Sequence, residues 1–212
     1  MAEFDWVTFF SGLFGSAITA GGVFYAARQL KLNAKQHESA EEWKRMEFAS
    51  QLVERLSKDE ELAFCARALD WAVGPLIIPE KYRVLFQNKE ITIDHDWNKL
   101  ARAVQPQLDP AGLDPELLVY RYCFDAFGGY LETIARHLEL GTVKRDHLVG
   151  VGYFLSVLMD AEYYRMLPTS MKLPAVTEKN VFAGFFKSFY PETLPLLAAA
   201  SAFPGARPPE RG

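Results

Sequence analysis

From Trp6 to Ala27 the chain runs for 22 residues without a charged side chain. As an α-helix, a run of this length extends about 33 Å, and the hydrocarbon core of a bilayer is about 30 Å thick. A buried helix of a soluble domain usually carries a polar face, whereas this run offers only hydroxyls and glycines. A cleaved signal peptide needs a basic start, but Glu3 and Asp5 precede the run. We therefore predict a transmembrane helix over residues 6–27.

The charges on either side of this run predict its orientation. Residues 1–5 carry only acids, whereas Arg28, Lys31 and Lys35 follow the run before the first acid, Glu38. Lys and Arg close to a span favour the cytoplasmic side of the membrane. We therefore expect a short external N-terminus, a basic cluster at the cytoplasmic membrane interface, and a C-terminal domain inside the cell.

Small residues recur within the predicted span. Gly12, Ser16 and Ala20 are spaced four apart and so share one face of a helix. Small residues at this spacing let two helix backbones approach closely in lipid, although they are also common in membrane helices that pair with nothing. We predict this face as a helix-packing face for self-association.

Composition limits the classes of partner. The remaining 185 of the 212 residues are enough for one domain with a hydrophobic core. Of the net charge of −4, Glu3 and Asp5 supply −2, so the domain is nearly neutral and no nucleic-acid partner is expected. The expected partners are the lipid bilayer and either a protein or a second copy of the chain. Cys65 and Cys123 lie in apolar helical contexts and are predicted to be buried free thiols.

The chain after the span predicts an all-α fold, in which the transmembrane helix is followed by a cytoplasmic helical bundle. Residues 28–58 are highly charged, contain neither Pro nor Gly, and should continue the membrane helix. Residues 59–203 should form the bundle, and residues 204–212 have the composition of a disordered tail. An apolar stripe near the end of the charged helix should pack on this domain; its members are Met46, Ala49, Val53 and Leu56.

Within the bundle, the pattern predicts a helix from residue 59 to Gly74-Pro75, a short helix at 82–86, and an extended piece at Ile91–Ile93. Asp94 then resembles the N-cap of a further helix. An aromatic helix over 181–189 and a short one over 192–202 end the domain. An exposed apolar surface on helix 181–189 would favour an interaction role.

The clearest helix runs from Asp114-Pro115 to Gly141, with Asp as N-cap and Pro at the first helical position. Its apolar stripe is predicted to be core; the members are Tyr120, Phe124, Phe127, Leu131, Ile134 and Leu138. The next helix, opening at Asp146 and ending before Pro168, should pack against it as an antiparallel hairpin. Gly128-Gly129 inside the first helix indicates a neighbour packed closely there.

Motifs that would assign a chemistry are absent. The chain has no phosphate-binding GxxxxGK[ST] loop, HExxH, CxxC pair or GxSxG elbow, and no Arg is followed by His at the spacing of helical HEPN-type ribonucleases. His37 should be solvated in the charged helix. We assign no catalytic, cofactor-binding or metal-ligating residue, and the sequence favours a non-enzymatic role while leaving an enzyme as an alternative.

Three groups of polar residues nevertheless contain potential ligands or acid–base groups. Asp94-His95-Asp96 is the densest, but adjacent residues at a helix start usually serve as caps. A second group (His137, Glu139, Asp146 and His147) flanks the hairpin turn, where polar residues are ordinary. The third would bring paired carboxylates together across the hairpin for acid–base work: Asp125, Asp160 and Glu162.

The layout resembles that of uncharacterised bacterial single-pass membrane proteins with a helical cytoplasmic domain of unknown function. The strings that carry the resemblance are Arg28–Asn33, Arg45–Ala49, Tyr130–Ile134 and Leu140–Val143. It implies a location in the bacterial inner (cytoplasmic) membrane and transfers no functional residue.

Three functions follow from these patterns. The first is a membrane-anchored helical interaction or regulatory module without an evident catalytic site. The second is a self-associating membrane effector of a bacterial stress or phage-defence system. The third is an enzyme that uses the carboxylate group above.

Overall fold

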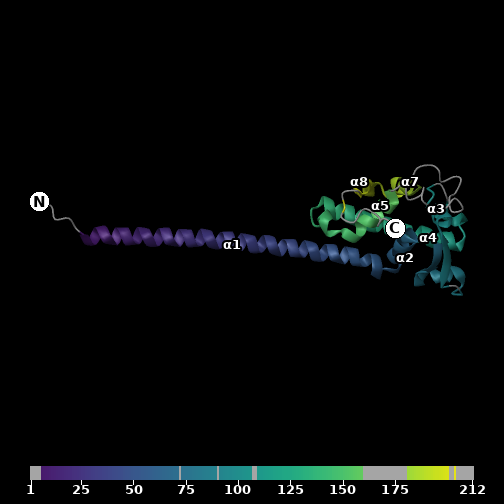
Figure 1. Ribbon diagram of the computed structural model, residues 1–212, viewed down its shortest axis with the longest axis horizontal. Helices are drawn as coiled ribbons and strands as arrows, with labels where there is room; N and C mark the ends of the chain where they lie inside the picture. Colours follow the sequence, from purple (N-terminus) through teal and green to yellow (C-terminus); the bar gives the residue numbers. More distant parts are fainter. Residues whose placement is uncertain are drawn as a thin grey trace, which may run out of the picture. The chain divides into compact units, whose positions relative to one another are not determined.

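The fold is that of a computed structural model, which describes residues 6–71, 73–89, 91–106, 109–159, 181–200 and 203; the side chains of residues 6–27 are outside this description. Figure 1 labels the main helices. The chain divides into two units, Met1–Arg45 and Met46–Gly212. The described residues are mostly helical, as predicted. The predictions for residues 1–5, for the helix end before Pro168 and for the tail 204–212 lie outside the described residues.

The first unit contains most of helix α1, Trp6–Lys58, whose 53 residues confirm that the charged segment continues the preceding helix. The side chains from Arg28 to Glu41 are exposed, as a helix with polar residues on all sides requires. Arg45 pairs with Glu41 and Glu42 one turn back. Among the described residues, we find no helix that combines the length and the apolar character needed to cross a membrane.

The second unit begins with the last turns of α1, and three of the four predicted stripe residues pack on the domain: Ala49, Val53 and Leu56. The fourth, Met46, is exposed, so the prediction is wrong for that residue. Ala49 and Leu56 are buried, and so is Leu52, whose carbonyl accepts a hydrogen bond from the Tyr130 hydroxyl at 2.9 Å. Helix α2, Glu60–Asp70, follows at once. Asp59 is its N-cap, so the acids that start the helix lie where they complement the helix dipole.

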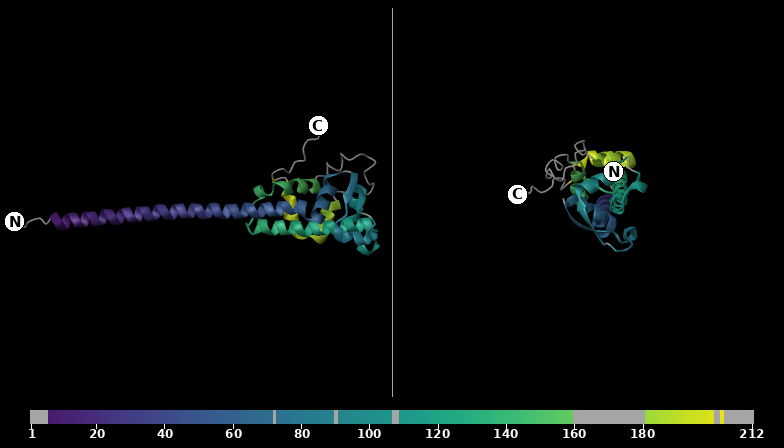
Figure 2. Two further views of the ribbon diagram at one scale, coloured as in Figure 1. Left: turned by 90° about the horizontal axis from the view of Figure 1, so that it is seen from below. Right: turned by 90° about the vertical axis from the view of Figure 1, so that its right-hand side faces the viewer.

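Helix α4, Pro115–Glu139, is the centre of the core. It starts after the N-cap Asp114, as predicted, and its aromatic stripe is buried from Tyr120 to Ile134. Over the described residues the predicted direct hairpin with the next helix is wrong, because α5, Val149–Met159, packs on α2, α7 and α8, and α2 in turn packs on α4. The left view of Figure 2 shows the blue helices between teal α4 and green α5.

A two-stranded antiparallel sheet corrects the all-helical prediction. Strand β1, Val73–Ile77, pairs with β2, Thr92–Asp96, in the register Gly74↔His95 and Leu76↔Ile93. Helix α2 therefore ends at Asp70, before the predicted stop. Leu76 and Ile93 form the buried face of the sheet.

Each outer edge of this sheet has one backbone group that cannot pair with a further strand. The Ile78 amide donates a hydrogen bond to the Ile91 carbonyl, so Ile78 faces β2. Because backbone groups alternate in direction along a strand, the amides of residues 74 and 76 also face β2. Pro75 therefore faces the free edge of β1, where it has no N–H to offer. The Lys99 ammonium covers the Asp94 carbonyl on β2 at 2.7 Å. Protected edges of this kind disfavour strand addition.

The C-terminal elements close the core. Helix α7, Val181–Phe189, confirms the predicted aromatic helix, and η5, Pro191–Thr193, and α8, Leu194–Ala198, follow it. Phe182, Phe185 and Phe186 are fully buried, and only Phe189 is substantially exposed. The extensive apolar surface that would favour an interaction role is therefore not on this helix. Short elements complete the unit: η1 (Glu80–Phe86), α3 (Trp97–Ala103), η2 (Pro110–Gly112) and η3 (Arg145–His147).

Candidate functional site

An acidic pocket lies where the start of α2 meets the start of η1. It has a volume of about 520 Å³ and is open to solvent. Its lining residues come from two segments twenty residues apart in the chain: Asp59, Glu60, Glu61, Pro79, Glu80 and Lys81. Four carboxylates and one ammonium group give the lining a formal charge of −3.

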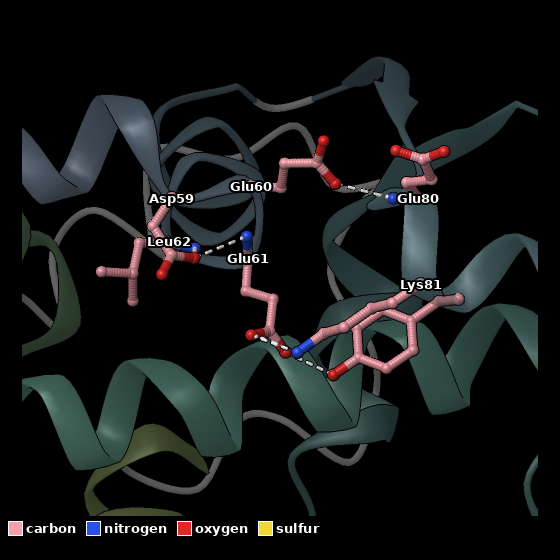
Figure 3. A network of polar contacts seen from close by, with 7 residues as sticks. Asp59, Glu60, Glu61, Leu62, Glu80 and Lys81 are labelled. Atoms are coloured by element: carbon pink, nitrogen blue, oxygen red, sulfur yellow. Dashed lines mark hydrogen bonds and ion pairs between the residues drawn. The ribbon is translucent and has the colours of Figure 1, made fainter.

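Hydrogen bonds between the two segments hold the pocket together (Figure 3). The Glu80 amide donates to the Glu60 carboxylate at 2.7 Å. The Lys81 ammonium lies 2.6 Å from the Glu61 carboxylate, which also accepts a hydrogen bond from the Tyr82 hydroxyl. The Asp59 side chain accepts from the amides that begin α2, at 3.0 and 3.3 Å. Each acid but Glu80 therefore has a structural partner.

The electrostatics of the pocket suit a cation. Burial, and next the hydrogen bond to Glu61, raise the pKa of Tyr82, so its hydroxyl stays protonated and cannot act as a base. The lining contains no His, Cys or Ser, the residues that most often act as nucleophile or general base. The pocket can admit an ammonium or guanidinium group, but its residues do not assemble a reaction centre.

The cluster Asp94-His95-Asp96 is divided by the sheet. Asp94 is exposed on β2, His95 is buried, and Asp96 is the N-cap of α3, accepting from the Lys99 amide at 2.9 Å. The N-cap thus lies two residues after the predicted one. Within the described segments, no three side chains of the types that ligate metals are grouped to hold an ion.

This difference gives a matched pair of variants. Asp96→Ala should lower the free energy of unfolding by about 1 kcal/mol, because the α3 amide loses its acceptor. Asp94→Ala removes an exposed side chain of the same kind and should change that energy by less than about 0.5 kcal/mol. Urea unfolding of the full chain, followed by tryptophan fluorescence, measures both. Equal losses would mean that Asp96 does not cap α3.

The histidines at the predicted hairpin turn do not form a site with their neighbouring acids. His137 bonds to the Thr142 hydroxyl at 2.8 Å and packs edge-on against Phe48. Gly141, with φ of +67°, ends the turn after α4 in a conformation that favours glycine. His147 lies in η3 and also has interactions of its own.

Of the three predicted carboxylates, Asp125 lies among the described residues. Asp160 and Glu162 lie outside the described residues. Asp125 faces Arg121, with 3.5 Å between Oδ2 and Nε, and accepts a hydrogen bond from the Tyr190 hydroxyl at 3.1 Å. Burial, opposed by Arg121 and Tyr190, raises the pKa of Asp125. Asp125 is thus held in a structural network that joins α4 to η5.

The predicted membrane residues all lie on α1. Gly12, Ser16 and Ala20 are in its first half, where the structure does not describe side chains. The basic residues Arg28, Lys31 and Lys35 are exposed, as is His37. Exposed cations on a helix are available to lipid headgroups.

The buried Arg121 of α4 escaped prediction. Arg121 is 4% exposed and lies over the rings of Phe185 and Phe189, with carbonyl acceptors from α3 and the loop after it. The only sequence signal was its i,i+4 spacing from Asp125. The thiols of Cys65 and Cys123 are buried and free, as predicted, and burial raises the pKa of Cys65.

Comparisons with protein-family models, curated proteins and solved structures found no match to this chain. Function therefore has to be argued from the residues themselves.

Proposed function

We propose that this chain is a membrane-anchored helical interaction or regulatory module of the bacterial inner membrane. Residues 6–27 cross the bilayer once, the N-terminus lies outside, and the globular unit lies on the cytoplasmic side. The observation that carries the proposal is the charge-free run at the start of a helix whose far end is built into a folded domain. The exposed basic cluster after the run agrees with this orientation.

A non-catalytic role is favoured by the state of the polar groups. Three of the four acids at the pocket, Asp59, Glu60 and Glu61, act as caps or cross-links, and Asp125 is engaged by an arginine and a tyrosine. A domain held at a membrane by one helix suits a role in binding a protein or a second copy of itself.

The first test is membrane insertion. We expect the tagged full chain to remain in bacterial membranes after alkaline carbonate extraction. Leu13→Lys combined with Ile18→Lys should release it, because charges near the centre of a span are costly. Leu30→Lys with Leu32→Lys adds the same charges at exposed positions just beyond the run and should leave the chain in the membrane. Release of the unchanged chain by carbonate would contradict the anchor.

The second test addresses the orientation. Protease added outside spheroplasts should spare the globular unit, and cleavage of that unit would indicate the opposite orientation.

The third test addresses the partner. Purification from native membranes in mild detergent, with mass spectrometry and a native mass, should find a stoichiometric second protein. A homo-oligomer without a partner would instead support the self-associating effector, with Gly12→Ile as the variant that tests its helix-packing face.

A further inference from the structure

His95 is a buried histidine that joins three elements of the globular unit. It is 3% exposed and stands on β2. Its Nδ1 lies 2.6 Å from the Tyr120 hydroxyl of α4, and its Nε2 lies 3.0 Å from the Trp71 carbonyl at the end of α2. The Trp97 indole donates to the same carbonyl at 3.0 Å. Two hydrogen bonds of one imidazole ring therefore tie the sheet to both helices.

The partners assign the protonation state of the ring. A carbonyl can only accept, so Nε2 carries a hydrogen, and in the neutral ring Nδ1 accepts from the Tyr120 hydroxyl. A doubly protonated ring would present a second N–H to that hydroxyl, which would have to turn its own hydrogen elsewhere. Tyr120 is fully buried, and the described contacts give its hydroxyl no hydrogen-bond partner besides His95. In the protonated state, the Nδ1–H of His95 and the O–H of Tyr120 are therefore both donors at a buried position, where the hydroxyl hydrogen has no described acceptor.

The charges around the ring do not remove this conflict. Burial is the largest influence and lowers the pKa of His95. The Trp71 and Ala68 carbonyls of α2 and the Asp96 carboxylate favour the charged ring, whereas Lys99 of α3 opposes it. On α4, Glu116 and the Cys123 thiol act on Tyr120, whose pKa is raised mainly by burial, so it too stays neutral.

We propose that the His95 bridge is a proton-sensitive latch, which holds the β1–β2 sheet on α2 and α4 when neutral and releases the sheet when the ring takes up a proton. Release uncovers the inner face of the sheet, Leu76 and Ile93, both buried in the closed state. This device adds a response to acid pH and is independent of the membrane anchor and of any partner.

The sign of the pH dependence follows from linkage. Because the closed state lowers the pKa of His95, the stability that the bridge supplies is complete above the ordinary pKa of about 6.5 and is lost as the pH falls below it. If the ring stays neutral in the closed sheet, the opening equilibrium constant rises about tenfold between pH 7.5 and 5.5.

Amide hydrogen exchange of the full chain in mild detergent measures this opening. Protection factors, corrected for the intrinsic exchange rate at each pH, should fall about tenfold for peptides that cover residues 73–78 and 91–96. Peptides from the second half of α4 should keep their protection. An equal loss across α4 would show global unfolding rather than release of the sheet, and unchanged protection at the sheet would also overturn the latch.

A matched pair of variants assigns the effect to one residue. His95→Gln keeps a neutral group that can donate and accept, so whatever its overall stability, the sheet should lose its pH dependence. His37→Gln removes an exposed histidine and should keep the dependence of the unchanged chain.

Exchange at the imidazole C2 position, read by mass spectrometry on the unchanged chain, needs no variant to fold. His95 should titrate below the ordinary histidine pKa of about 6.5. Titration of His95 at or above that value would refute the proposal.

Discussion

Gly128→Ala is expected to lower the free energy of unfolding by about 1–3 kcal/mol, although alanine is the better helix former. A Cβ at this position of α4 would lie 2.5–2.6 Å from three ring atoms of Tyr190. The ring cannot move away cheaply. Its hydroxyl donates to the Asp125 carbonyl at 2.9 Å, and Phe185 and Phe186 pack beside it. Inserting a methyl group therefore strains the contact between α4 and the segment after α7.

The adjacent residue supplies the control for this prediction. Gly129 lies in the same helix, and a Cβ there would meet nothing within 4 Å. Gly129→Ala should therefore stabilise the domain by about 0.5–1 kcal/mol, since only the entropy and helix-propensity gains remain. Denaturant unfolding of both variants measures the contrast. In a Tyr190→Ala background the clash is gone, so Gly128→Ala should no longer destabilise. A destabilisation that persists there would mean that Tyr190 is not the obstacle.

The helices were the part of the fold that local pattern could predict. Helix α4 combines an Asp-Pro start, a 3.6-residue apolar period and a glycine stop, and these signals agree with one another. The close neighbour expected at Gly128-Gly129 is Tyr190. Its ring packs against Gly128 but not against Gly129. Sequence indicated the contact but could not select the partner, which comes from a distant segment.

The extended piece predicted at Ile91–Ile93 overlaps β2, but strand β1 could not be predicted, for a physical reason. β1 contains Gly74 and Pro75, both poor strand residues, and it is held by pairing with a strand that follows η1. The same pairing moves the N-cap from Asp94 to Asp96, because the strand extends further than its apolar residues indicate. The acidic pocket likewise depends on this turn of the chain, which brings Glu80 and Lys81 to the start of α2.

Arg121→Ala should have the largest effect of the substitutions considered, a loss of about 3–5 kcal/mol in the free energy of unfolding. Nη1 of Arg121 donates to the Gln105 carbonyl at 3.3 Å, and its guanidinium carbon lies 4.4 Å from the centre of the Phe189 ring. Truncation leaves the carbonyl acceptors and the Asp125 carboxylate without their cation. It also removes the side chain that joins α3 and α7 to α4.

Two further substitutions separate charge from volume. Arg121→Met keeps the aliphatic stem against the phenylalanine rings, so it should cost less than Arg121→Ala. Arg136→Ala removes an exposed arginine from the same helix and should change stability by less than about 0.5 kcal/mol. Urea unfolding of the full chain measures all three. A loss from Arg121→Ala no greater than that from Arg136→Ala would show that the buried cation is not a structural link.

The pH dependence of the Arg121→Ala variant gives an independent check. Burial already raises the pKa of Asp125, and the arginine opposes that rise. Without the arginine, the folded-state pKa should rise further above the value in the unfolded chain. A carboxyl group whose pKa is higher in the folded state binds its proton more tightly in that state. The resulting stabilisation is fully present at low pH and is lost as the pH rises through the folded-state pKa. The loss relative to the unchanged chain should therefore shrink between pH 7 and pH 4.5. A loss that stays constant over this range would mean that Arg121 stabilises the domain through packing and its carbonyl bonds alone, without neutralising Asp125.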